Sequence, residues 1–157
     1  MRFEKISIER FHTDKLDERC DYADVKLPKR ATRFSAGYDF YAPFAFTLEA
    51  GQTVKIPTGI RVLLDDDKFL MIVPRSGLGF KFRLQLDNTA GIIDADYAGS
   101  ANEGHIFIKL TNDSREGKTL SVAQGEAFAQ GIILQYFTTE DDDSVAVRNG
   151  GFGSTNG

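Results

Sequence analysis

The segment 86–99 holds the strongest candidate for a catalytic base. Two isoleucines run directly into Asp94, so we expect its carboxylate at the rim of a partly dry pocket. A carboxylate placed there can orient a water molecule and take its proton. Asn88 offers both a donor and an acceptor, Gly91 permits the close approach of a ligand, and Tyr97 provides a flat wall. An ordinary β-turn with polar residues would explain any one of them alone.

A second segment has the composition of a phosphate-binding turn. A strand predicted to end at Val73 leads through Pro74 into Arg75, Ser76 and Gly77, which offer a guanidinium, a hydroxyl and backbone N–H groups. A further strand presents Gln130, whose amide can reach a phosphate or a metal-bound water. Arg-Ser-Gly is also common in turns that bind nothing, so this segment gains weight only in combination with others.

The C-terminal segment 148–157 is rich in glycine and is unsuited to packing in a core. Two interpretations are open: a disordered terminus, or a lid that closes over a nucleotide. Glycines let backbone N–H groups approach phosphates, hydroxyls donate to phosphates, a guanidinium adds charge, and an aromatic ring stacks on a flat base. The residues that would do so are Arg148, Phe152, Ser154 and Thr155.

Other candidate centres are weak. His12 and His105 stand alone, without a second His or Cys at ligand spacing, so a zinc site is not expected. Cys20 is the one cysteine, which excludes an internal disulfide, and no nearby residue supplies a base to activate it. The acidic runs 65–67 and 140–143 are typical of solvated loops, because neighbouring like charges repel each other.

Length and charge limit the class of protein. The 157 residues suit one globular domain. The formal net charge of −4 argues against a nucleic-acid partner, and a polyanionic ligand must be held by a few placed cations and backbone N–H groups. No apolar run approaches the roughly 18 residues of a membrane span. The first residues lack the apolar stretch of a signal peptide, so we expect a cytoplasmic protein without membrane contact.

Short apolar runs separated by turn residues predict an all-β barrel or jelly roll. The 13 Phe and 5 Tyr favour strands, and no window holds a helical stripe over three turns. At most one short helix is expected, over 76–82. We expect residues 1–143 to form the barrel, and residues 144–157 to form a strand and a flexible glycine-rich lid of the same domain. The predicted strands are Lys5–Phe11, Tyr38–Ala42, Thr53–Ile56, Gly59–Leu63, Phe69–Val73, His105–Leu110, Ala127–Gln135 and Ser144–Val147.

Together these segments resemble the five ordered motifs of the trimeric dUTPase family, which hydrolyses dUTP to dUMP and pyrophosphate. All five occur in the family's order, from about residue 28 to the end of the chain. Each motif alone is unspecific, and the specificity lies in their order and spacing. The resemblance implies a distorted jelly-roll β-barrel and a homotrimer with shared active sites. The motifs are Ala36–Ala42, Pro74–Gly79, Asn88–Gly99, Gly125–Gln130 and Gly150–Thr155.

The resemblance assigns roles to the residues around the base and the sugar. Asp94 is similar to the catalytic carboxylate, which activates the water that attacks the α-phosphorus. Asn88 and the backbone around Gly91–Ile93 would read the uracil edge, and a tight wall at uracil C5 would exclude dTTP. Tyr97 would stack under the deoxyribose and leave no room for a 2′-hydroxyl. Phe152 would stack on the uracil when the tail closes.

The resemblance also implies a Mg²⁺ cofactor on the triphosphate. Asp39 is similar to the aspartate that binds water molecules of this ion. Because Mg²⁺ and two arginines would offset the charge, the in-line attack would need only positioning and one base. The residues implied to hold the triphosphate are Arg75, Ser76, Gly77, Gln130, Arg148, Gly153, Ser154 and Thr155.

Two other classes remain open at this point. A dCTP deaminase of the same fold would carry a glutamate where this chain has Lys109, and it would lack the glycine-rich tail. A nucleotide-binding protein without activity would lack the base, whereas Asp94 is present. The chain also departs from the common pattern of the family. Arg148 lies one residue closer to Phe152 than in many members, and residues 100–104 lengthen a loop whose role the sequence does not reveal.

Overall fold

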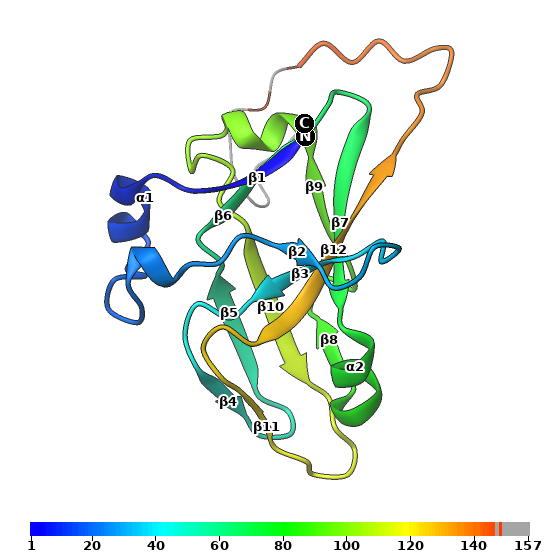
Figure 1. The fold of residues 1–157 in the computed structure, drawn as a ribbon. Coiled ribbons are helices and arrows are strands. Elements are labelled where there is room, and N and C mark those ends of the chain that lie inside the picture. Colours follow the sequence, from blue (N-terminus) through cyan, green and yellow to red (C-terminus); the bar gives the residue numbers. More distant parts are fainter. Residues whose placement is uncertain (147, 149–157) are drawn as a thin grey trace.

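Antiparallel strands dominate the computed structural model, which describes residues 1–146 and 148 (Figure 1). The expected all-β class is confirmed. The helical segments are α1 (Ile8–Thr13), η1 (Tyr22–Asp24), α2 (Ser76–Phe82) and η2 (Ala95–Gly99). The strands are β1 (Arg2–Lys5), β2 (Lys29–Arg30), β3 (Tyr38–Tyr41), β4 (Phe46–Leu48), β5 (Thr53–Pro57), β6 (Ile60–Leu63), β7 (Lys68–Pro74), β8 (Leu84–Leu86), β9 (Gly91–Asp94), β10 (Phe107–Asn112), β11 (Leu120–Val122) and β12 (Ala127–Gln135).

The largest sheet brings together motifs that are far apart in the sequence. Its strand order is β2-β3-β12-β7-β9, and a second sheet has the order β5-β10-β8. Two further pairs, β1 with β6 and β11 with β4, complete the described pairing. The register places Gln130 of β12 between Asp39 of β3 and Val73 of β7. Three of the five motifs therefore meet at one end of this sheet.

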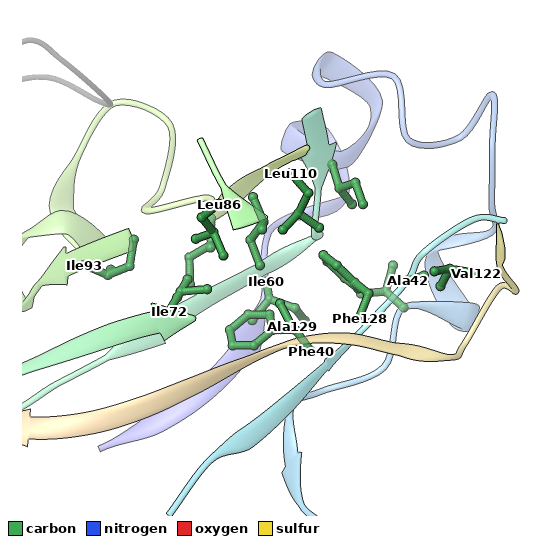
Figure 2. Close-up of a cluster of buried hydrophobic side chains, with 14 of the residues drawn as sticks. Phe40, Ala42, Ile60, Ile72, Leu86, Ile93, Leu110, Val122, Phe128 and Ala129 are labelled. Carbon is green, nitrogen blue, oxygen red and sulfur yellow. The ribbon is translucent and has the colours of Figure 1, made fainter. Parts of the chain in front are cut away.

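The apolar faces of the strands enclose one core (Figure 2). In β7 the buried residues alternate along the strand, as expected where one face of a sheet is covered. Phe40 and Phe128 are almost fully buried and lie in the middle of the cluster, whereas Ile72, Leu86 and Ile93 lie at one end of it. This end of the core borders the turn between β8 and β9, which carries the third motif.

Two short α-helices occur where at most one was expected. α2 confirms the predicted helix over 76–82. The predicted strand Lys5–Phe11 was wrong, because β1 ends at Lys5 and α1 follows. Ser7 begins this helix, since its side chain accepts a hydrogen bond from the Arg10 N–H at 3.1 Å. A serine cap of this kind favours a helix over continued strand, which the alternation of so short a run could not reveal.

The remaining differences concern short elements. The sequence predicted no strand at β2, β4, β8, β9 or β11, which are two to four residues long and give little periodic signal. A strand was predicted at Ser144–Val147, but residues 144–146 contain none, and Val147 lies outside the described residues. Within the described part of the chain, no helix has the length and apolar character needed to cross a membrane.

Candidate active site

The candidate base, Asp94, is the last residue of β9. Residues Gly91 and Ile93 of this strand are buried and Ile92 is exposed, so the strand alternates as a half-covered strand should. Asp94 pairs across the sheet with Phe69 of β7. Its side chain is 49% exposed, so one chain alone does not form the partly dry rim expected from the sequence.

Arg148 joins the base to the neighbouring turn. Its Nη2 group donates to an oxygen of Asp94, and its Nε group donates to Asp96 Oδ1 at 2.8 Å. The guanidinium also lies over the ring of Tyr97, 5.9 Å from the ring centroid. The side chain of Arg148 is only 18% exposed. The structure thus brings three predicted site residues together, Asp94, Tyr97 and Arg148, although they come from segments about 50 positions apart.

Tyr97 is held at its hydroxyl group. The hydroxyl donates to the backbone oxygen of His105 at 2.9 Å and accepts a hydrogen bond from Asn102 Nδ2 at 2.8 Å. The residue is 4% exposed, and burial raises the pKa of the phenol. Tyr97 therefore stays neutral near pH 7, and its ring is fixed at the hydroxyl end.

His105 is buried beside this tyrosine and is held in one tautomer. Its Nδ1 lies 2.5 Å from Asp14 Oδ2, and its Nε2 accepts a hydrogen bond from the Gly59 N–H at 2.9 Å. Nε2 must be unprotonated to accept this bond, so the ring is neutral with its proton on Nδ1. Burial lowers the pKa of His105 and outweighs the opposing effect of Asp14.

This lowered pKa predicts a loss of stability in mild acid. The unfolded chain binds a proton near pH 6.5 and the folded chain only at lower pH, so the free energy of unfolding should fall as the pH drops below about 6.5. The slope for one proton is at most about 1.4 kcal/mol per pH unit. Urea unfolding between pH 5.5 and 8 measures it. His105→Gln should flatten the profile, while His12→Gln should retain it. An unchanged profile in His105→Gln would contradict the assignment.

A cavity beside Ile93, which we name the β8–β9 cavity, has a volume of about 430 Å³. This size is within the range of small-molecule sites. Three predicted uracil-binding residues line it: Asn88, Gly91 and Ile93. The space at Gly91 is tight, because a Cβ there would lie 3.3 Å from the Cβ of Ile72. The other lining residues are Lys55, Ile72, Leu86, Asp87, Phe107, Ile108 and Lys109.

A second cavity, the Arg75 cavity, has a volume of about 260 Å³ at the end of β7. Arg75 Nε lies 3.0 Å from Asp39 Oδ1, and Arg75 Nη1 donates to the Ala127 backbone oxygen at 3.2 Å. These contacts fix the guanidinium and leave other donors for an anion. Gln130 is fixed similarly, because its Nε2 donates to the Pro74 oxygen at 3.1 Å. The lining residues are Ala31, Ser35, Gly37, Asp39, Arg75, Ser76, Gly77, Leu78 and Gln130.

Gly37 keeps the amide of Gln130 in this cavity. A Cβ at position 37 would lie 2.4 Å from Gln130 Oε1. We expect Gly37→Ala to displace the amide and to raise the KM for the substrate at least about tenfold, the effect of losing one charge-assisted hydrogen bond. The melting temperature should change little, because the displaced atom ends a flexible side chain. Gly79→Ala, where a Cβ meets nothing within 4 Å, is the matched control. An unchanged KM in Gly37→Ala would exclude a role for the Gln130 amide.

Asp94 and Arg75 lie toward opposite ends of β7. Asp94 is paired with Phe69, and Arg75 directly follows Pro74 at the end of the strand. Six residues of extended chain span about 20 Å. Adjacent phosphates in a triphosphate share a single bridging oxygen, so one triphosphate cannot reach both groups within one chain. The candidate base and the candidate phosphate-binding arginine therefore belong to two separate regions of one chain.

The sequence also missed several lining residues. Ser35 and Leu78 lie in the Arg75 cavity, and Lys55 and Phe107 lie in the β8–β9 cavity. Leu78 lies within the motif Pro74–Gly79 and Ser35 directly precedes the motif Ala36–Ala42, so the motifs pointed to both positions without assigning them a role. Lys55 is far from every motif, and only its strand pairing places it there. The predicted residues Phe152, Gly153, Ser154 and Thr155 lie outside the described residues.

Comparison with known proteins agrees with the motif pattern. The dUTPase family model matches residues 23–156. The chain belongs to the dUTPase family. This membership confirms the resemblance predicted from the motifs and the expectation that the protein is an enzyme of that family.

The similarity to other members of the dUTPase family extends over most of each chain. The deoxyuridine 5'-triphosphate nucleotidohydrolase of Lactococcus lactis is 35% identical over 136 residues, which cover 85% of this chain and 89% of that protein. The dUTPase crystal structure from Streptococcus mutans has a TM-score of 0.70 and 31% identity, and the match covers 89% of this chain and 99% of that one. A dUTPase from the Staphylococcus aureus phage phi11, described with a structural Mg(II) ion, shares the fold with a TM-score of 0.62 and 21% identity, over 78% of this chain and 92% of that one.

Proposed function

We propose that the protein hydrolyses dUTP to dUMP and pyrophosphate in a homotrimer with shared active sites, in the cytoplasm. The observation that carries this proposal is the pair of complementary half-sites. One half is a cavity of nucleobase size lined by Ile93, the residue before Asp94 in β9. The other half presents Arg75 and Gln130 to an anion. Family membership and the names of the relatives supply the substrate.

The uracil end of the substrate would occupy the β8–β9 cavity. The amide of Asn88 and the backbone at Gly91–Ile93 would read the edge of the base. A side chain at position 91 would press against Ile72, so glycine leaves the backbone at this position open to the base, and a tight wall at uracil C5 would exclude the methyl group of dTTP. Tyr97 would lie under the deoxyribose and exclude a 2′-hydroxyl. This arrangement makes the site selective for both the base and the sugar.

Asp94 would act as the general base. Its carboxylate would orient a water molecule and take a proton as the water oxygen bonds to the α-phosphorus. The bond from that phosphorus to the bridging oxygen would break on the opposite side, and pyrophosphate would leave. Arg148 pairs with Asp94 in the free chain. A triphosphate carries more negative charge than the two carboxylates, so it would draw Arg148 away and free the base.

The phosphates would bind in the Arg75 cavity, together with the C-terminal segment of the chain. Arg75, Ser76, Gly77 and Gln130 offer donors that the structure already holds near one another. The tail would close over this assembly, with Phe152 on the uracil and Arg148, Gly153, Ser154 and Thr155 on the phosphates.

Asp39 fits the binding of Mg²⁺ through water. It lies in the Arg75 cavity with its side chain 15% exposed. The described residues contain no group of three or more metal-ligating side chains. One carboxylate together with substrate phosphates and water is a donor set typical of Mg²⁺. Bound in this way, Mg²⁺ would neutralise charge on the triphosphate.

The separation of the half-sites supports an assembly in which sites are shared between subunits, as in the proposed homotrimer. About 20 Å of strand lies between the Asp94 and Arg75 positions of one chain. Closed rings of identical subunits place one face of each copy against a different face of the next. Such an assembly can bring Asp94 of one subunit to Arg75 of another.

Mixed subunits test the shared site directly. Neither the Asp94→Asn protein nor the Arg75→Ala protein should be active alone. Co-expressed in equal amounts, they should recover about one quarter of the wild-type activity, because a random trimer pairs intact partners at one site in four. Co-expression of Asp94→Asn with Asp94→Ala is the matched control and should stay inactive. No recovery from the first mixture would show that each site lies within one chain.

The reaction itself is tested with four nucleotides. The purified protein and Mg²⁺ are incubated with dUTP, dCTP, dTTP or UTP, while pyrophosphate and ammonia are measured. Pyrophosphate from dUTP alone is the expected result. Ammonia from dCTP would identify a deaminase, and no product from any nucleotide would identify a binding protein. Either of these results would overturn the proposed function.

A further inference from the structure

The loop after η2 holds Tyr97 at both ends of the residue. Asn102 Nδ2 and the His105 backbone oxygen bind the phenol hydroxyl, at 2.8 Å and 2.9 Å. The Ser100 hydroxyl donates to the Tyr97 backbone oxygen at 2.7 Å. Residues 100–104 are the loop extension noted in the sequence. The extension therefore packs under the candidate sugar-binding residue and is not a free surface loop.

The loop is held in turn by the N-terminal helix α1 and its cap. The Glu103 carboxylate accepts hydrogen bonds from the Ser7 N–H at 2.8 Å and from the Ser7 hydroxyl at 2.6 Å. Arg10 Nη2 donates to the Ala101 backbone oxygen at 2.8 Å. These contacts attach the start of α1 to the loop at Ala101 and at Glu103, although the two segments are more than 90 positions apart in the sequence.

A buried pair at the end of α1 makes the third attachment. His105 is 0% exposed, and its Nδ1 group donates to Asp14, which follows the last residue of the helix. The other ring nitrogen accepts a hydrogen bond from the N–H of Gly59, which directly precedes β6. The backbone oxygen of His105 accepts a hydrogen bond from the Tyr97 hydroxyl, so movement of His105 would move the hydroxyl with it.

The two segments thus form one structure, which we name the bracket: residues 7–14 and residues 100–105. The N-terminal part precedes the family match, which begins at residue 23. No bracket residue lines either cavity. Among its contacts with the candidate active site are the hydrogen bonds to Tyr97 and a ring contact of His105 with Phe107, a residue of the β8–β9 cavity, at 4.3 Å between centroids.

We infer that the bracket is a positioning device for Tyr97, in which Asn102, His105 and Asp14 set the sugar selectivity of the enzyme. This inference rests on the proposed function, because Tyr97 acts there as the wall that excludes a 2′-hydroxyl. A ring fixed at its hydroxyl cannot tilt to admit the extra oxygen of a ribose. If the hydroxyl end of the ring is released, the ring can tilt and the 2′-oxygen of a ribose fits more easily.

Three variants separate positioning from folding. Asn102→Asp removes the donor to the Tyr97 oxygen but keeps the Oδ1 that accepts from the Gly104 N–H at 3.2 Å. Asp14→Asn weakens the buried pair with His105. Asp17→Asn is the matched control, because Asp17 contacts His12 at 3.1 Å in an exposed pair just after the same helix.

Two readouts are measured for each variant. The first is the ratio of kcat/KM for dUTP to kcat/KM for UTP, which a general loss of folded protein does not change. We expect it to fall about tenfold in Asn102→Asp and in Asp14→Asn, the change that loss of one net hydrogen bond supports. The second readout needs no nucleotide. It is the Tyr97 ring signal in protein labelled with ¹³C-tyrosine, assigned among five tyrosines with Tyr97→Phe.

The outcomes distinguish the inference from the proposed function. A shifted or broadened Tyr97 signal with a lower dUTP-to-UTP ratio in both variants, and neither change in Asp17→Asn, is the expected result. A lower melting temperature with an unchanged signal and ratio would make the bracket purely structural and overturn the inference. If the unmodified protein releases no pyrophosphate from dUTP, the proposed function fails instead. The Tyr97 signal then still shows whether the bracket fixes the ring.

Discussion

Asp94→Asn is expected to lower kcat at least about a thousandfold, within the range for loss of a general base. The amide has nearly the same shape as the carboxylate but cannot take a proton from water. Arg148 Nη2 can still donate to its oxygen, so the surrounding contacts should be retained. Binding should be retained. The dissociation constant of dUTP on Asp94→Asn should lie within about threefold of the constant that the unmodified protein has for a nonhydrolysable dUTP analogue.

Asp96→Asn is the matched control for this variant. Asp96 accepts a hydrogen bond from the same Arg148 side chain at 2.8 Å and is similarly exposed, at 53% against 49%. Any effect that passes through a displaced Arg148 should therefore appear in both variants. We expect Asp96→Asn to lower kcat by less than about tenfold. Equal losses of binding and turnover in Asp94→Asn would instead make Asp94 a structural residue.

Local features of the site were predictable because they depend on neighbouring residues. Asp94 and Tyr97 lie within one strand end and the turn that follows, so their proximity needs no knowledge of the fold. The turn at Arg75 and the helix after it were predicted for the same reason. The predicted strand Lys5–Phe11 was wrong although only neighbouring residues are involved. Its alternating pattern is only seven residues long, and the N-cap at Ser7 stabilises a helix from the next residue on.

Contacts between distant segments could not be derived from the residues alone. The Asp39–Arg75 pair depends on the register of β3, β12 and β7, and nothing in a single sequence fixes a register. The approach of Arg148 to Asp94 depends on the path of the chain after β12. The bracket gives no sequence signal either, since His105 and Asp14 are 91 positions apart. The order of the motifs indicated the family, and the fold was needed to show that Asp94 and Arg75 lie toward opposite ends of β7.

Removal of the C-terminal segment should have the second large effect. We expect a chain ending at Arg148 to lose at least about a hundredfold in kcat/KM, because the proposed lid positions the phosphates and excludes water. The assembly should remain trimeric by light scattering. Its melting temperature should change little, since the core cluster lies entirely between residues 6 and 129.

A second truncation, ending at Val147, separates Arg148 from the glycine-rich segment. It removes the guanidinium that pairs with Asp94 and Asp96, so two half-exposed carboxylates lose their common partner. If Arg148 also binds phosphate, this protein should show a higher KM than the chain ending at Arg148. An equal KM in the two truncations would show that Arg148 does not bind phosphate and only pairs with Asp94 and Asp96 in the absence of substrate. Full activity in the first truncation would exclude a lid, and the substrate would then have to be enclosed by the β8–β9 cavity and the Arg75 cavity alone.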